Sequence, residues 1–164
     1  MTDLETPRLV LHPMTPAEAE RVAAGSPPAG ARWAPGYPSP GERGAAARYL
    51  ATCLGTGDPS PFCSYEIRLR ADGLVVGGIG FHGAPDDRGG VTVGYGLVES
   101  VRGQGYASEA LRALLRFARE QGVARVRGDA DADNIPSQRV MTAAGMRLVG
   151  EDASLKYYLA EWTA

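Results

Sequence analysis

The chain has 164 residues, of which 44% are hydrophobic and 22% charged, a balance typical of one globular domain with a buried core. Its 17 basic and 19 acidic residues give a formal net charge of −2, so we expect neither nucleic acid nor an anionic membrane as the main partner. No apolar run approaches the ~18–20 residues of a membrane span and the N-terminus has no signal-peptide pattern, so we expect a single cytoplasmic domain over residues 1–164.

The metal-binding residue types are sparse. Cys53, Cys63, His12 and His82 are the only cysteines and histidines, too few and wrongly spaced for a zinc site, so no metal is expected. A structural disulfide is not expected in a cytosolic chain. We therefore interpret both cysteines as buried or half-buried small apolar residues.

The first third of the chain predicts one short strand and two helices. Residues 9–11 are apolar and typical of a strand. Residues 15–18 (Thr-Pro-Ala-Glu) and 39–42 (Ser-Pro-Gly-Glu) each carry the signature of a helix start, with a capping hydroxyl, proline at the first position and glutamate closing a capping box. The two helices are expected to end near Gly25 and Gly55.

The loop between these helices holds two large aromatic residues, Trp33 and Tyr37, among many Pro, Gly and Ala residues. A loop with two such side chains is seldom a mere linker. The pair either covers a small core or lines the mouth of a substrate site, and the sequence leaves both readings open.

The rest of the chain predicts a mixed sheet. Residues 64–69, 74–81 and 91–98 read as three antiparallel strands joined by turns, and 106–121 is the strongest amphipathic helix. The next strand follows this helix by a crossover and should lie parallel to strand 91–98. We predict an α/β (α+β) fold with a mixed, mostly antiparallel sheet of about seven strands and helices on both faces; its remaining elements are strand 123–130, helix 136–144 and strands 146–151 and 155–162.

The most informative segment is the turn from Val101 to Ala107, between a strand and the best helix. Glycines at 103 and 105 let successive backbone amides point at one place, and the free N–H groups of the helix start lie there too. This pattern predicts an anion site suited to a pyrophosphate; the alternative is a tight turn that binds nothing.

A second glycine pattern, from Gly78 to Gly83, matches Gly-x-Gly-x-x-Gly literally. It lies within a predicted strand and is followed by a turn, whereas the dinucleotide fingerprint requires a helix there. We interpret these glycines as sites of close backbone approach or a bulge.

Together three segments resemble the GNAT acetyltransferases. Arg102-x-x-Gly105-x-Ala107 is similar to their acetyl-CoA motif, residues 6–11 (Thr-Pro-Arg-Leu-Val-Leu) are similar to the opening strand of the ribosomal-protein N-terminal acetyltransferase branch, and residues 134–137 and 143–146 are similar to that branch's Asn-x-x-Ser and Ala/Leu-Gly-Phe segments. The resemblance covers nearly the whole chain and is weakest over 26–63.

The resemblance implies acetyl-CoA as co-substrate and a role for each matching residue. Ser137 would lie near the sulfur and protonate the departing thiolate, while Asn134 would bond the pantetheine arm. The end of strand 91–98 would pair its backbone with that arm, and the loop amides would hold the pyrophosphate. The implied cofactor-binding residues are Leu97, Val98, Arg102, Gly103, Gln104, Gly105, Tyr106, Ala107, Ser108 and Asn134.

One position departs from that branch. Many relatives carry a glutamate two residues before the Gly-Tyr of this strand as a candidate base, and this chain has Thr92. Threonine cannot accept a proton at neutral pH, so we name His82 as the best replacement, with Glu66 as a weaker candidate.

Two functions remain open from the sequence. The leading hypothesis is an N-acetyltransferase in which an amine, from a small molecule or a protein N-terminus, attacks the thioester directly. The alternative is a non-catalytic acyl-CoA-binding sensor or scaffold of the same fold. A monomer and a homodimer paired through the last strands are both compatible with the pattern.

Overall fold

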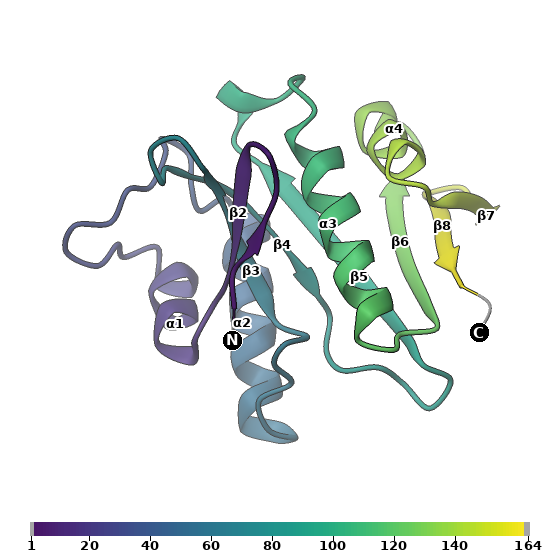
Figure 1. Cartoon of the computed structure of the whole chain (residues 1–164), viewed down its shortest axis with the longest axis horizontal. Coiled ribbons are helices and arrows are strands. Elements are labelled where there is room, and N and C mark those ends of the chain that lie inside the picture. Colours follow the sequence, from purple (N-terminus) through teal and green to yellow (C-terminus); the bar gives the residue numbers. More distant parts are fainter. Residues whose placement is uncertain (1, 163–164) are drawn as a thin grey trace.

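An eight-stranded sheet with the order β1-β2-β3-β4-β5-β6-β8-β7 forms the centre of the molecule (Figure 1). All neighbouring strands are antiparallel except β5 and β6, which are parallel as the crossover predicted. The computed structural model describes residues 2–162. The strands are β1 (Leu4–Glu5), β2 (Leu9–Pro13), β3 (Ser64–Leu69), β4 (Val75–Phe81), β5 (Gly90–Leu97), β6 (Arg125–Asp131), β7 (Arg147–Glu151) and β8 (Leu155–Glu161).

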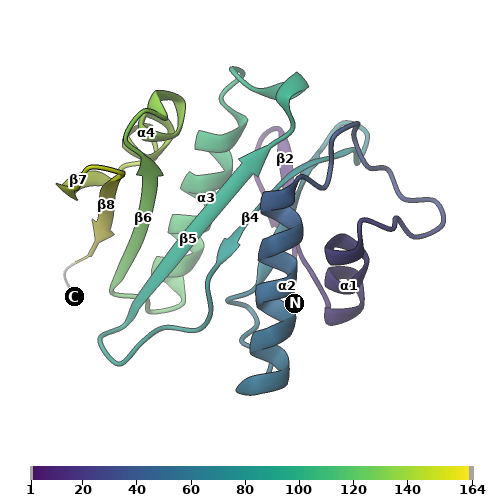
Figure 2. The same cartoon turned by 180° about the vertical axis from the view of Figure 1, so that it is seen from behind.

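Helices cover both faces of this sheet, as expected. The helices α3 and α4 lie on one face, and α2 lies on the other with α1 beside it (Figures 1 and 2). The helices are α1 (Pro16–Ala24), α2 (Pro40–Gly55), α3 (Tyr106–Glu120) and α4 (Ile135–Ala143), with a short 3₁₀ turn at Glu99–Val101. Every helix within residues 2–162 is too short or too polar to span a lipid bilayer.

Local sequence signals explain most of these boundaries. Thr15 and Glu18 form the predicted capping box at the start of α1, and Gly25 ends that helix in the left-handed conformation. The predicted capping box of Ser39 and Glu42 at the start of α2 was wrong. Within residues 2–162 the Ser39 side chain makes no capping bond to the α2 backbone, because its hydroxyl donates instead to the Glu42 carboxylate.

The core lies where α3 packs on the sheet. Leu111 and Leu114 of α3 are fully buried, as are Leu11 of β2 and Ile67 of β3. Burial of each such side chain stabilises the fold by roughly 1.5–3 kcal/mol. Both cysteines match the expectation: Cys63 is buried, Cys53 is half-buried, and both are free thiols.

The strand count exceeds the expected seven because β1 adds a two-residue edge to β2, pairing Leu4 with Leu11 and Glu5 with Val10. Two residues are too few to show the alternation from which a strand is predicted.

The glycines of β4 behave as interpreted, since a Cβ on Gly77 would collide with the Gly96 carbonyl and one on Gly80 would lie 2.7 Å from the Cys63 carbonyl oxygen.

The strands β5 and β6 separate partway along their length, and this separation positions the site. They pair only over Gly90–Thr92 and 125–127 and then diverge toward the ends from which α3 and α4 begin (Figure 1). From Val93 onward β5 keeps its partner β4 but, among the described residues 2–162, has none on the β6 side. The result is an open wedge between two parallel strands, with the start of a helix beside each strand end.

Candidate active site

The turn from Arg102 to Gly105 brings unpaired amides to the start of α3. Gly103 and Gly105 have φ values of +80° and +82°, which other residues adopt only with strain, and Gly105 is the cap of α3. Within residues 2–162, the backbone amides from Gly103 to Ser108 donate to no other group. Six unpaired donors at a helix N-terminus are an arrangement suited to an anion, as predicted for this turn.

Arg8 ties this turn to the start of β2. Its Nη1 donates to the Gln104 carbonyl over 2.8 Å, and its guanidinium stacks 4.4 Å from the centre of the Tyr106 ring. Its Nε lies 2.7 Å from a carboxylate oxygen of Glu109 in the first turn of α3. Glu109 also accepts hydrogen bonds from the Thr6 hydroxyl (2.5 Å) and the Arg8 amide (2.9 Å).

This contact sets the ionisation of Glu109. Burial alone would raise the pKa of the carboxyl group, but the hydrogen bonds from Thr6 and Arg8 and the Arg8 charge outweigh burial and lower it. Neither Arg8 nor Glu109 was identified from the sequence as part of the site, since they lie 101 positions apart. The signal was present only as the Thr-Pro-Arg at the opening strand.

The opposite side of the wedge is formed by the start of α4. The Asn134 side chain caps this helix by accepting the Ser137 amide over 3.2 Å. The Ser137 hydroxyl lies 2.8 Å from the Tyr95 hydroxyl, which also donates to the Ser137 carbonyl over 3.0 Å. Because Tyr95 belongs to β5, this contact bridges the wedge and holds two hydroxyl groups together.

Tyr95 was not predicted as a site residue, although its Gly-Tyr was noted. Burial, chiefly, raises the pKa of its phenol, so the hydroxyl stays protonated at neutral pH. The Tyr95–Ser137 pair therefore holds a protonated phenol in contact with the Ser137 hydroxyl.

The strand register shows which β5 groups face the wedge. The His82 amide donates to Thr92 O and the Val98 amide to Val76 O, so even-numbered positions of β5 bond to β4. The N–H and C=O groups of Val93, Tyr95 and Leu97 thus point away from β4, although the Leu97 carbonyl already accepts Arg102 Nε over 3.1 Å. Leu97 fits the predicted backbone role, whereas the Val98 amide is engaged with β4.

A cavity of about 280 Å³ lies on the α2 face of the same strands. Its floor is bare backbone, because glycines fill the positions of β4 and β5 that face α2. Its walls come from α2 and from apolar side chains of neighbouring elements. The floor consists of Gly78, Gly80, Gly94 and Gly96, and the walls include Met14, Glu42, Ala45 and Arg48. Tyr65 and Phe81 also border the cavity, but their rings pack toward Phe117 of α3 on the opposite face of the sheet.

His82 lies at this cavity and on the same sheet face as Thr92. The two residues are backbone partners, and the imidazole folds over Gly94, where an added Cβ would lie 3.0 Å from Nε2. Partial burial, followed by the nearby Arg48 guanidinium, lowers the pKa of His82 although its side chain still reaches solvent. A neutral imidazole near pH 7 is able to accept a proton.

Trp33 and Tyr37 do not border this cavity. They pack edge to face with ring centres 5.3 Å apart, and Tyr37 is 6% exposed with its hydroxyl unpaired. Trp33 instead lines a second hollow of about 420 Å³ beside α1. Their placement supports the interpretation as core cover.

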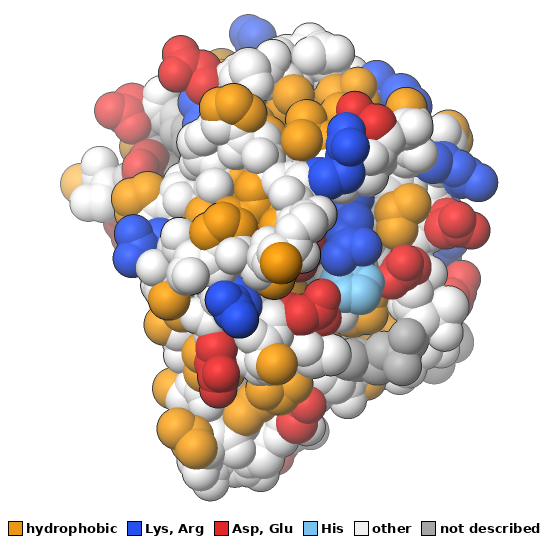
Figure 3. Space-filling view, turned by 90° about the vertical axis from the view of Figure 1, so that its left-hand side faces the viewer, with side chains coloured by type: hydrophobic (Ala, Val, Ile, Leu, Met, Phe, Trp, Pro, Cys, Tyr) orange, Lys and Arg blue, Asp and Glu red, His pale blue; other side chains and the backbone are white. Residues whose placement is uncertain are grey.

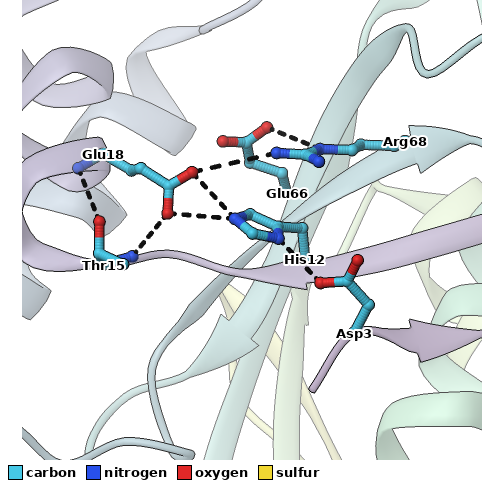
Figure 4. Close-up of polar contacts among 6 residues, drawn as sticks. All are labelled: Asp3, His12, Thr15, Glu18, Glu66 and Arg68. Atoms are coloured by element: carbon cyan, nitrogen blue, oxygen red, sulfur yellow. Dashed lines mark hydrogen bonds and ion pairs between the residues drawn. The ribbon is translucent and has the colours of Figure 1, made fainter. Parts of the chain in front are cut away.

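The second hollow is bordered by a paired charge cluster. Figure 4 shows His12 between Asp3 (2.8 Å) and Glu18 (2.9 Å), and Arg68 between Glu18 and Glu66. Viewed in Figure 3, the side of the molecule that carries α1 shows acidic and basic side chains interspersed. Since each carboxylate of the cluster contacts a basic side chain, this cluster is a structural network. In the part of the chain that the structure describes, no group of three or more His, Cys, Asp or Glu side chains is arranged to hold a metal.

A wedge between parallel strands, with unpaired amides at the helix that follows the first of them, defines the class as a GNAT acetyltransferase fold. The family model described as "Acetyltransferase (GNAT) domain" matches residues 8–147, so the chain belongs to this family. The predicted family is confirmed.

Individual relatives agree with this assignment. The chain is 33% identical over 99 residues to the uncharacterized N-acetyltransferase YjdG of Bacillus subtilis, a match that covers 60% of this chain and 59% of that protein. Among solved structures, the ribosomal-protein-S5-alanine acetyltransferase of Vibrio fischeri aligns with a TM-score of 0.69 at 12% identity, covering 98% of this chain and 97% of that one. RimL, a ribosomal L7/L12 alpha-N-protein acetyltransferase in complex with coenzyme A, aligns with a TM-score of 0.68 at 18% identity over 98% of both chains. The structural matches are similarities of fold.

Proposed function

We propose that the protein transfers an acetyl group from acetyl-CoA to a primary amine of a small molecule or a protein N-terminus. The observation that carries this proposal is the run of unpaired amides from Gly103 to Ser108 beside the open edge of β5. Family membership supports the choice of an acetyl donor, and YjdG carries N-acetyltransferase in its name. RimL, a neighbour in fold, was solved with coenzyme A.

The residues present suit this donor. Amides from Gly103 to Ser108 would hold the pyrophosphate, and the turn is open there, since a Cβ on Gly103 would meet no atom within 4 Å. Leu97 would offer its backbone to the pantetheine arm, and Asn134 would bond the same arm from α4. Arg102, through its bond to Leu97 O, would keep the strand end in place.

Acetyl-CoA, when bound, supplies an activated acetyl thioester. His82 would take a proton from the acceptor amine directly or through water, because its lowered pKa keeps the imidazole neutral. Ser137, in contact with the protonated Tyr95 hydroxyl, would return a proton to the departing thiolate. The Tyr95–Ser137 pair and His82 lie on different elements, so proton uptake and proton release are assigned to separate groups.

We also propose that the protein is cytoplasmic and either monomeric or paired as a homodimer through β7. This edge strand has five residues, all of them exposed. A direct test combines calorimetry with acetyl-CoA and a released-thiol assay against a panel of amines and N-terminal peptides. Tight binding with thiol release for at least one acceptor supports the proposal. Binding without release identifies a non-catalytic acyl-CoA module, and absence of binding overturns the assigned site.

A further inference from the structure

Glu42 is a nearly buried carboxylate that faces the cavity without a cationic partner. The residue is 8% exposed, lies in the first turn of α2 and lines the cavity wall. The Ser39 hydroxyl donates to one of its oxygens. Within residues 2–162, no Lys, Arg or His side chain forms an ion pair with it. A buried carboxylate without a cation is costly, so this arrangement indicates that a ligand provides one.

The nearby buried carboxylate Glu66, unlike Glu42, has a cationic partner. It is 5% exposed and lies on the same sheet face, since its strand partner is Gly78, over which Glu42 packs. Arg68 pairs with it over 3.3 Å, and the pair joins the cluster drawn in Figure 4. The fold therefore neutralises Glu66 internally and leaves Glu42 unneutralised.

The position of Glu42 relates it to the proposed reaction. The Glu42 Cγ lies 3.0 Å from the position that a Cβ on Gly78 would occupy. The Glu42 Oε2 lies 3.7 Å from the corresponding Cβ position on Gly96. Gly96 is part of β5, whose other edge forms the wedge (Figure 2). The carboxylate thus lies over the same strand that borders the wedge. The glycines of that strand place no side chain between the two on the α2 face.

Other ionisable groups of the cavity leave this role to Glu42. Arg48 lies six residues further along α2, a rise of about 9 Å, and repels a cation. His82 is held neutral, and Tyr95 is protonated. Behind the wall, the unpaired Tyr37 hydroxyl is buried near both Glu42 and Glu66, whose charges add to burial in raising the pKa of that phenol.

We propose that Glu42 binds the ammonium group of the acceptor and selects amines that are cationic in solution. The Met14 and Ala45 side chains, which line the same cavity, would receive an alkyl or benzyl arm. This inference rests on the proposed acetyl transfer for its chemistry, but the binding site stands on the cavity and its unpaired carboxylate.

The ammonium loses one proton to His82, and the nitrogen lone pair forms a bond to the carbonyl carbon of the acetyl thioester. The carbon–sulfur bond breaks with its electron pair on sulfur, which takes a proton from the Ser137–Tyr95 pair. The nitrogen also loses a second proton, which replaces the one that the Ser137–Tyr95 pair gave to sulfur. Overall, one proton passes to water.

The test compares wild type with Glu42→Gln, which keeps the size of the side chain and an oxygen for the Ser39 hydroxyl. Calorimetry with benzylamine on the protein saturated with coenzyme A should show binding that weakens about tenfold or more in the variant, the scale expected for a charge-assisted hydrogen bond. The Kd for acetyl-CoA should stay within about twofold, since the carboxylate lies across β5 from the wedge. The melting temperature of the free variant should equal or exceed that of wild type, because a costly buried charge is removed.

Two controls sharpen the result. Glu66→Gln removes a buried carboxylate outside the cavity and should leave benzylamine binding unchanged, and Ser39→Ala removes the hydroxyl but keeps the charge. In turnover, the loss of kcat/KM in Glu42→Gln should be large for benzylamine and smaller for hydroxylamine, which is uncharged at the assay pH. Glu42→Asp, which restores the charge, should recover part of the binding.

Unchanged benzylamine affinity in Glu42→Gln would overturn the role of Glu42. A lowered melting temperature together with lost acetyl-CoA binding would also overturn it, in favour of a structural carboxylate. If benzylamine binds through Glu42 but no amine releases thiol, the acetyl transfer fails while the ammonium site stands.

Discussion

Neutralising Glu109 tests whether the contact with Arg8 holds the anion-binding turn in place. Glu109→Gln keeps the shape of the side chain but removes the charge that accepts hydrogen bonds from Thr6 and Arg8. Hydrogen bonds to charged groups contribute roughly 1.5–3 kcal/mol when buried, and Arg8 is 45% exposed, which discounts the ion pair. We expect a net loss of about 1–2 kcal/mol, which lowers the melting temperature by about 2–8 °C in a chain of this size.

The pH dependence of this loss gives a sharper test. The pKa of Glu109 is lowered in the folded protein, so its contribution to stability is present above the unfolded value of about 4.3 and is lost as the pH falls through the folded pKa. Thermal denaturation should therefore show a difference between wild type and Glu109→Gln at pH 7 that shrinks toward pH 3. Glu120→Gln, at the exposed far end of α3, is the matched control and should stay within about 0.5 kcal/mol of wild type. No difference at pH 7, or a difference that persists unchanged at pH 3, would refute the reasoning.

Other variants test the cofactor and catalytic assignments. Gly105→Val should raise the acetyl-CoA Kd about tenfold or more in calorimetry, because φ is +82° there and the new Cβ would lie 3.3 Å from Arg8 Nη2; unchanged affinity would remove the turn from the site. Ser137→Ala should lower kcat with little change in acetyl-CoA affinity, and Asn134→Ala should weaken binding as well as remove the cap of α4, at about 1 kcal/mol of stability. A wild-type kcat in the serine variant would exclude the proton transfer. The wild-type kcat/KM should fall on the acid side with an apparent pKa below about 6.5, since burial and Arg48 lower the pKa of His82. His82→Ala should remove this acid-side decrease and slow the reaction roughly 10²-fold. A pH–rate profile of His82→Ala that overlays the wild type would favour solvent as the base.

Much of the fold was predictable because its signals are local. Capping residues, the apolar stripe of α3 and turn glycines fixed every predicted boundary within two residues. The crossover through α3 correctly predicted the parallel pair β5 and β6, because a strand–helix–strand connection of this kind has one favoured arrangement. The two-residue β1 was missed because its pairing with β2 leaves no pattern in the sequence.

The site was predictable only where it is contiguous. The glycines of the anion-binding turn are neighbours in sequence, so their joint geometry could be inferred before the structure. Arg8 and Glu109, by contrast, meet only after β2 docks on α3, and Tyr95 meets Ser137 only across the wedge. Glu42 was interpreted as a capping residue, and its exposure to a cavity depends on how α2 lies over the glycines of β4 and β5.

The bare glycine floor of the cavity has a consequence for how the protein can be altered. Backbone atoms are the same whatever the sequence, so the floor itself offers no side chain by which acceptors are told apart. The side chains that α2 contributes, at Glu42, Ala45 and Arg48, belong to a helix that contributes nothing to the anion-binding turn. Acceptor binding and acetyl-donor binding are thereby encoded in separate stretches of the chain. A library of substitutions at these three positions should therefore change which acceptor is bound and leave the donor site unaltered.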